Sequence, residues 1–197
     1  MPKIVLGSAS ASRIALLRNA GLDFTARPAA IDERSIEAPL VAAGASPAEI
    51  AMALAEAKAL AVAKDASGVL VIGADQVLGV DGRCWHKPAS LAEARDQLLA
   101  LSGQTHTLET AMAVADAGAI AWRHADTARM TMRQLSAGEV DGYLGEVGER
   151  ALASVGAYQI EGPGIRLFEA IDGDYFAILG LPLLPLLGFL RRARALA

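Results

Sequence analysis

A basic side chain follows a turn that could bind an anion. Arg13 comes shortly after Gly7-Ser8-Ala9-Ser10, a small-residue turn between an apolar run and the start of a helix. Backbone N–H groups, the positive end of a helix dipole and a guanidinium together favour an anionic ligand. An ordinary helix cap with a solvated arginine would give the same pattern. The segment therefore indicates either a phosphate site that includes Ser8 and Arg13, or a cap.

Asp75 is the first candidate for acid–base chemistry. It lies in Ile72-Gly73-Ala74-Asp75-Gln76, after the β-branched run Val69–Ile72. We expect that strand to end at Gly73, so that Asp75 stands just past it, where ligands bind in open α/β sheets. A carboxylate there could accept a proton from water or help to hold a cation. It could equally be a turn or cap residue.

Two lysines are further candidates. Lys58 shares one helical face with Ile50, Leu54 and Ala61, a spacing typical of the apolar side of a helix. A lysine on such a face either extends to the rim or points into a cleft. Lys87 precedes a proline in an extended segment, and a surface position explains it equally well.

The remaining polar candidates are ambiguous by themselves. Glu33 and Glu161 could each be a surface charge. His86, His106 and His124 lack metal-ligand spacing, and we predict that they are not catalytic. The sequence has neither a Gly-x-x-x-x-Gly-Lys-Ser/Thr loop nor a Gly-x-Gly-x-x-Gly loop after a strand, which excludes the standard P-loop and dinucleotide-binding classes.

Together these residues provide a few acids and several cations at strand ends, helix starts or an apolar helix face. Such a set suits chemistry on phosphates, in which cations hold a polyphosphate while an acid and a metal activate water. The residues alone indicate this class of chemistry and no particular reaction.

Strand-like and helix-like runs alternate along the chain, which is typical of an α/β fold. Lys3–Leu6 is expected to be a buried strand, followed by a helix from about Ser12 to Ala20 and a strand over Leu22–Ala26. Thr107–Ala115 and Ala119–Arg133 are expected to be long antiparallel strands.

Local signals mark helix starts and turns. Ser46, Ser90 and Ser136 are each followed three residues later by Glu, which predicts a capping box and a helix start. Asp81-Gly82 and Asp172-Gly173 are typical of hairpin turns. We predict a mixed α/β (α+β) fold, a twisted mixed sheet with flanking helices, over residues 1–197 as a single domain with two lobes around a cleft.

Composition narrows the class of protein further. The 197 residues carry a net charge of −4, which argues against a general nucleic-acid binder, and the single cysteine, Cys84, excludes an internal disulfide framework. We see no signal peptide. The apolar segment Phe176–Leu190 is short for a membrane span and contains Pro182 and Pro185, so we expect a buried terminal helix. We predict a soluble cytoplasmic protein without a membrane partner.

The chain resembles the Maf family of nucleotide pyrophosphatases over nearly its whole length. The segments that carry the resemblance are Leu6–Arg13 with Leu16-Leu17, Ile31–Glu33, Leu54–Ala59, Ile72–Gln76, Lys87-Pro88, Leu101–His106, Gly156–Tyr158, Ile171–Tyr175 and Gly180–Leu183. No single segment is decisive, and their number and order make the resemblance specific.

The resemblance implies a Maf/ITPase-like fold with a deep nucleotide-binding cleft, a divalent metal (Mg²⁺ or Mn²⁺) and a homodimer. It implies hydrolysis of a nucleoside triphosphate between the α- and β-phosphates, which removes non-standard nucleotides. By position, Asp75 would be the proton acceptor. Ser8, Arg13, Glu33, Lys58 and Lys87 would form the phosphate and metal shell, with Glu33 and Asp75 as metal ligands.

Three further positions concern the base. Gln76 and Glu161 resemble the branch that acts on 7-methyl-GTP, whereas the dTTP/UTP branch usually has Thr and Gln there. Ser12 departs from the arginine or tryptophan usual at its position. The alternatives are a dTTP/UTP pyrophosphatase of the same family and a non-catalytic nucleotide-binding regulator of septum formation.

Overall fold

The computed structural model describes residues 2–64 and 68–196. Seven strands in these residues form one mixed sheet in the order β2-β1-β3-β5-β6-β7, and β4 pairs with β3. The strands are β1 (Lys3–Leu6), β2 (Thr25–Ala26), β3 (Val69–Val80), β4 (Arg83–Trp85), β5 (Thr105–Asp116), β6 (Ala119–Met132) and β7 (Phe168–Asp172). The mixed sheet confirms the predicted fold class.

Helices connect and flank these strands. The α-helices are α1 (Ala11–Asn19), α2 (Glu33–Ala42), α3 (Pro47–Ala63), α4 (Leu91–Leu101), α5 (Ala137–Val147), α6 (Tyr175–Ile178) and α7 (Leu183–Arg192). Short 3₁₀ helices are η1 (Gly148–Ala153), η2 (Val155–Ala157) and η3 (Pro163–Leu167).

The chain divides into two compact units. The first comprises Met1–Gln76, Glu109–Thr127 and Asp174–Ala197, and the second comprises Val77–Leu108 and Ala128–Gly173. The strands β3, β5 and β6 each have residues in both units. The expectation of a single domain with two lobes around a cleft stays a prediction.

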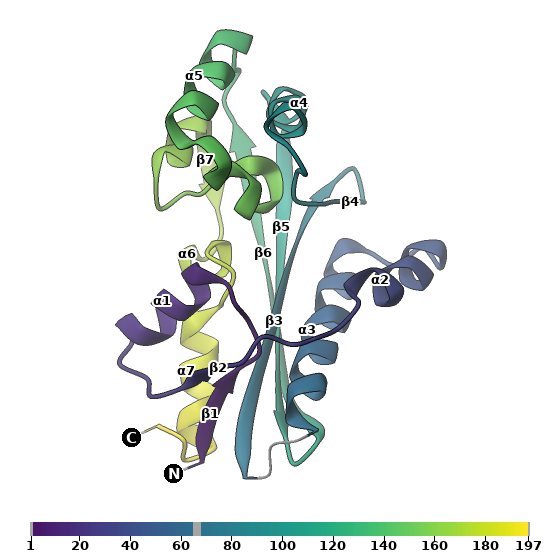
Figure 1. The fold of residues 1–197 in the computed structure, drawn as a ribbon, viewed down its shortest axis with the longest axis vertical. Helices are drawn as coiled ribbons and strands as arrows, with labels where there is room; N and C mark the ends of the chain where they lie inside the picture. The colour runs from purple at the N-terminus through teal and green to yellow at the C-terminus, as the bar shows by residue number, and fades with distance from the viewer. Residues whose placement is uncertain (1, 65–67, 197) are drawn as a thin grey trace. The chain divides into compact units, whose positions relative to one another are not determined.

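In the first unit, β1 pairs in parallel with both β2 and β3. Side chains alternate between the two faces of a strand. Leu70 and Ile72 of β3 join a core cluster with Leu17 of α1 and Leu186 of α7. The other face of β3 meets α3, so that α3 lies on the opposite side of these strands from α1 and α7 (Figure 1).

The contact between β3 and α3 is centred on Gly73. A methyl group on residue 73 would lie 2.1 Å from the carbonyl oxygen of Ala55 and 2.5 Å from the amide nitrogen of Ala59. Only glycine allows the two backbones to approach so closely. The prediction that the strand ends at Gly73 is therefore wrong, because this glycine accommodates a helix and the strand continues to Val80. Asp75 stands inside a strand and not beyond its end.

Other local predictions have mixed outcomes. The predicted helix starts after Ser46, Ser90 and Ser136 are confirmed. The reciprocal capping box closes at Ser46 and Ser136, whereas Glu93 accepts a hydrogen bond from the amide of Ala89 at 2.8 Å. The strand predicted over residues 22–26 is reduced to the two residues of β2.

Of the two predicted hairpin turns, one is confirmed. Asp81 and Gly82 join β3 to β4 with φ angles of 49° and 75°. Asp172-Gly173 is not a hairpin, because β7 is followed by the N-cap of α6, where Asp174 accepts from the amide of Ala177. The predicted terminal helix over residues 176–190 is interrupted between α6 and α7, where Gly180 has a φ of 92°.

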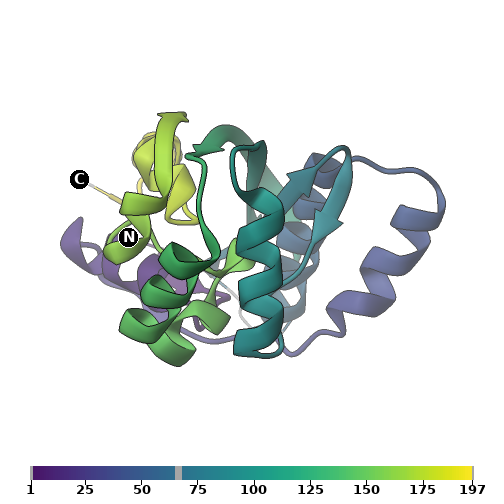
Figure 2. The same cartoon turned by 90° about the horizontal axis from the view of Figure 1, so that it is seen from above.

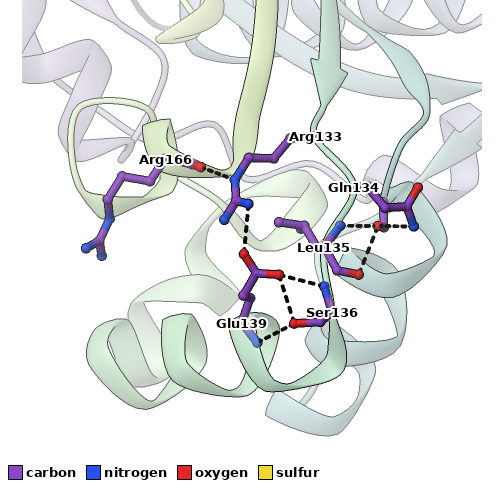
Figure 3. Close-up of polar contacts among 7 residues, drawn as sticks. Arg133, Gln134, Leu135, Ser136, Glu139 and Arg166 are labelled. Carbon is purple, nitrogen blue, oxygen red and sulfur yellow. Dashed lines mark hydrogen bonds and ion pairs between the residues drawn. The ribbon is translucent and has the colours of Figure 1, made fainter.

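The second unit packs helices around its strand segments. α4 contacts α5 and the short helices η1 and η2 (Figure 2). At the start of α5, Ser136 and Glu139 exchange hydrogen bonds, and Arg133 pairs with Glu139 at 2.8 Å (Figure 3). The backbone hydrogen bond from Ser136 lowers the pKa of Glu139 to about 2.

Among residues 2–64 and 68–196, the helices are too short or too polar to span a bilayer.

Replacing Gly73 by alanine should destabilise the protein, because the added methyl group would force α3 away from β3. We expect the free energy of unfolding to fall by about 3 kcal/mol, as measured by urea denaturation. Gly142→Ala is the matched control, since a methyl group there meets nothing within 4 Å. The control should be neutral or stabilising by up to about 1 kcal/mol. Equal stability of the two variants would contradict the proposed packing.

Candidate active site

An ion pair between α3 and β3 is the centre of the candidate site in the first unit. The ammonium nitrogen of Lys58 lies 2.5 Å from Oδ1 of Asp75, and the two side chains are only 12% and 10% exposed. The same nitrogen lies 2.8 Å from Oε1 of Glu33. Lys58 therefore does not extend to solvent, and of the two alternatives left open by the sequence, the inward orientation holds.

The start of α2 brings Glu33 to this lysine. Asp32 caps the helix by accepting hydrogen bonds from the amides of Arg34 and Ser35, and Glu33 is the first helical residue. The side chain of Glu33 is 53% exposed, so its carboxylate lies where the site meets solvent. The sequence did not predict this helix, which includes Pro39.

Arg13 is built into the site by hydrogen bonds to the backbone. Its Nε donates to the carbonyl oxygen of Gly180 at 2.8 Å, and its Nη1 donates to that of Ala74 at 2.8 Å. Nη1 also donates to the hydroxyl of Ser8 at 3.3 Å, and this hydroxyl accepts from the amide of Ser10 at 3.2 Å. Arg13 is thus not a solvated arginine, although Ser10 does cap α1 as the alternative interpretation required.

Burial and neighbouring charges act on Asp75 in opposite directions. Burial raises the pKa of Asp75, and the positive charges of Lys58 and Arg13 oppose that rise. A carboxylate with a raised pKa accepts a proton more readily near neutral pH than an exposed aspartate does. Burial also lowers the pKa of Arg13, but a guanidinium remains charged in proteins.

Two predicted specificity residues also lie in the first unit. Gln76 follows Asp75 in β3, so its side chain points to the opposite face. Its amide nitrogen donates to the hydroxyl of Thr110 at 2.8 Å and to the carbonyl oxygens of Ala177 and Ile178. Ser12 is half-buried in the first turn of α1. Their proposed contact with a base stays a prediction.

The second unit holds the two remaining predicted site residues, both exposed. Lys87 lies between β4 and α4, and Glu161 lies between η2 and η3. Glu161 lines a pocket of about 180 Å³, together with Tyr143, Arg150 and Gln159. The roles of Lys87 and Glu161 stay predictions.

Sequence reasoning missed two residues that hold predicted site residues in place. Thr110 is fully buried on β5, where its hydroxyl accepts from Gln76 and donates to the carbonyl oxygen of Ala177 at 3.0 Å. Nothing in the local sequence distinguishes this threonine. Gly180 supplies the carbonyl oxygen that holds Arg13, and the only signal was its place in a segment of the family resemblance.

Two carboxylates in the first unit could hold a metal ion. Glu33 and Asp75 both approach one ammonium group, so their oxygens converge on a single point. Mg²⁺ is commonly bound by one or two carboxylates together with water and substrate phosphates. This pair fits that requirement. The described residues contain no cluster of three or more His, Cys, Asp or Glu side chains that would bind a metal by themselves.

Comparison with known proteins identifies the family. A family model described as "Maf-like protein" matches residues 3–193. The chain belongs to the Maf family. It is 56% identical to the 7-methyl-GTP pyrophosphatase of Rhizobium meliloti (strain 1021), over 99% of this chain and 98% of the relative. It is 52% identical to the nucleoside triphosphate pyrophosphatase of Rhodopseudomonas palustris (strain BisB18), over 98% and 95%.

Among solved structures, this Maf-family chain is similar to the nucleoside-triphosphatase / dITP/XTP pyrophosphatase from Mycobacterium abscessus ATCC 19977 / DSM 44196. The TM-score is 0.46 at 15% sequence identity, with coverage of 98% of this chain and 95% of that chain.

Asp75→Asn should nearly abolish turnover, because the amide keeps the size of the carboxylate but cannot accept a proton. Loss of a general base typically lowers the rate by on the order of 10²–10⁴. The measurement is the rate of pyrophosphate release, with thermal unfolding to confirm the fold. Glu56→Gln is the control, because Glu56 lies on the same helix but pairs with Arg123. Activity of Asp75→Asn within a few-fold of the parent would make Asp75 structural.

Proposed function

We propose that this Maf-family chain hydrolyses a nucleoside triphosphate to the nucleoside monophosphate and pyrophosphate. The observation that carries the proposal is the buried Lys58–Asp75 pair, with Glu33 on the same ammonium group and the charge of Arg13 acting on Asp75. The names of the relatives support the same reaction.

Asp75 acts as the proton acceptor in this proposal. Since Oδ1 accepts the hydrogen bond from Lys58, we assign the incoming proton to Oδ2. A water molecule loses its proton to Asp75 as its oxygen forms a bond to the α-phosphorus. The bond from that phosphorus to the bridging oxygen of the β-phosphate breaks, and pyrophosphate leaves with the bonding electrons.

Positive side chains stabilise the charge that moves onto the phosphates. Lys58 is a compact point charge suited to phosphate oxygens, and its partner Glu33 is exposed enough to be displaced by a substrate. Arg13 donates its hydrogen bonds to backbone carbonyl oxygens and to the hydroxyl of Ser8. It contributes by positioning Ser8 and through the effect of its positive charge on Asp75. Lys87 is proposed as a further phosphate contact.

Glu33 and Asp75 would hold a divalent metal ion, Mg²⁺ or Mn²⁺. When bound, such an ion neutralises phosphate charge and lowers the pKa of a coordinated water molecule. The ammonium group of Lys58 contacts both carboxylates in this structure. Lys58 would therefore have to shift toward the phosphates before Glu33 and Asp75 could hold a metal ion.

We propose 7-methyl-GTP as the substrate, with Glu161 as the residue that selects the base. A guanine edge presents two adjacent donors, N1–H and the exocyclic NH₂, which one carboxylate can accept together. The 7-methyl group also makes the base cationic, and a carboxylate favours it where a neutral amide does not. The position of Glu161 in the wall of a pocket supports this role, since small ligands bind in concave sites with a few polar groups.

The first products should be the nucleoside monophosphate and pyrophosphate, in a reaction that requires a divalent metal. The relatives' names as pyrophosphatases favour a single attack at the α-phosphorus over stepwise loss of phosphates. Ion-exchange chromatography of early time points, with and without excess chelator, measures both features. Orthophosphate with the nucleoside diphosphate as first products, or full activity in chelator, contradicts the proposal.

Glu161→Gln should lower kcat/KM for 7-methyl-GTP and spare or raise that for UTP, because a glutamine amide matches the donor and acceptors of uracil. A good bidentate contact discriminates between bases by about 1–3 kcal/mol in DNA readout. At about 1.4 kcal/mol per decade, the loss on 7-methyl-GTP should be roughly ten-fold or more.

Glu169→Gln is the matched control for this substitution, because Glu169 is exposed on β7 of the same unit. It should leave both substrates unaffected. A parent enzyme that prefers dTTP or UTP would refute the proposed substrate. An unchanged preference in Glu161→Gln would show that this residue does not read the base.

A further inference from the structure

Two segments of the family resemblance play no part in the proposed chemistry, and they meet inside the second unit. Leu101–His106 ends at His106, and Gly156–Tyr158 ends at Tyr158. The imidazole Nε2 lies 2.6 Å from the phenolic oxygen, and the two residues are 1% and 4% exposed. Phe168 packs edge-on against the tyrosine ring, with the ring centroids 4.8 Å apart.

The backbone before Tyr158 has a fixed and unusual conformation. Gly156 and Ala157 both have positive φ angles, 74° and 61°, and such a conformation is strained for alanine. The hydroxyl of Tyr143 donates to the carbonyl oxygen of Ala157 at 3.1 Å. A methyl group on residue 156 would lie 2.6 Å from Cε1 of Tyr158, so the tyrosine ring packs directly on the glycine.

The chain after Tyr158 forms a closed loop that contains Glu161. The amide of Gly162 donates to the carbonyl oxygen of Gln159 at 3.2 Å. A methyl group on residue 164 would lie 2.6 Å from the same oxygen, so the backbone of Gly164 packs directly against the backbone of Gln159. Gln159 is the neighbour of Tyr158, and the buried ring therefore anchors the base of the loop.

His106 and Tyr158 are both uncharged near neutral pH, so the pair is unsuited to acid–base catalysis. Burial lowers the pKa of His106 to about 4 and raises the pKa of Tyr158. Neither group changes its charge near neutral pH. One ring nitrogen of the histidine, Nδ1, is buried without a hydrogen-bond partner among the described residues, and such buried unpaired groups are uncommon.

We infer that His106 and Tyr158 form a positioning pair for Glu161, holding the base of the loop over residues 159–164 so that the carboxylate keeps its place in the pocket wall. The inference rests on the proposed function, in which Glu161 selects the base. It assigns a role to two buried residues that the proposed chemistry does not use.

The test compares Tyr158→Phe with a matched control in the same unit. Tyr158→Phe removes the hydroxyl and keeps the ring that packs on Gly156. The control, Ser102→Ala, also removes a hydroxyl from one of these segments. That hydroxyl instead accepts a hydrogen bond from the amide of Leu135 at 2.7 Å, just before α5. Hydrogen exchange of the backbone amides and kcat and KM for 7-methyl-GTP and UTP are measured for both.

Tyr158→Phe should accelerate exchange at residues 159–164 and lower the preference for 7-methyl-GTP over UTP by about ten-fold, mainly through KM. Ser102→Ala should accelerate exchange near residue 135 and leave the preference unchanged. Exchange at 159–164 that does not respond to Tyr158→Phe overturns the inference, whatever the activity. A change of substrate preference in both variants also overturns the inference, because a general loosening of the second unit would then explain the result.

A double variant, His106→Leu with Tyr158→Phe, separates positioning from stability. Removing both partners leaves no polar group of this pair unpaired, so stability should recover relative to Tyr158→Phe. The preference for 7-methyl-GTP should stay low, and its recovery together with stability would show a purely structural role. If the parent releases no pyrophosphate from any nucleotide, the proposed function fails, and the exchange pattern alone decides whether the pair holds the loop.

Discussion

The close approach of α3 to β3 is the constraint on which the candidate site depends. Ala55 and Ala59 contact Gly73, and Lys58 lies between them on the same helix. Asp75 lies two residues beyond Gly73 on the same face of the strand, about 6.7 Å further along. Lys58 is three residues beyond Ala55, about 4.5 Å along the helix axis. A helix held against residue 73 thus brings its lysine onto the aspartate, and a side chain at residue 73 would separate them.

The packing of α3 on Gly73 also explains why the end of β3 could not be predicted from the sequence. Glycine ends a strand at a turn and also allows a helix to lie against a strand, and the local sequence around Gly73 is the same in either case. Only the tertiary contact decides, so the boundary after Ile72 was misplaced and Asp75 was assigned to the wrong kind of position. Signals that depend on one segment alone, such as the serine caps at Ser46 and Ser136, were predictable because their hydrogen bonds are local.

Three residues of the candidate site could be singled out from the sequence, but their contacts could not. Chemistry and helical spacing singled out Arg13, Lys58 and Asp75, since charged side chains at such places are uncommon. Their partners were not predictable: Glu33 meets Lys58 from a helix that the sequence did not reveal, and Gln76 faces away from its neighbour Asp75. The His106–Tyr158 contact spans 52 residues and leaves no local pattern.

The charges at the site bear on the metal proposal independently of any resemblance. Buried ion pairs contribute little to stability, because desolvation offsets their attraction, so the Lys58–Asp75 pair is poorly explained as a stabilising device. Lys58 and Arg13 carry two positive charges, and Glu33 and Asp75 carry two negative ones, which leaves a formal charge of zero among these four. A triphosphate would add several negative charges to a neutral cluster that includes a buried carboxylate. Added positive charge would supply the attraction that this neutral cluster lacks. Glu33 and Asp75 would hold a divalent cation for that purpose, which would free Lys58 to contact the substrate.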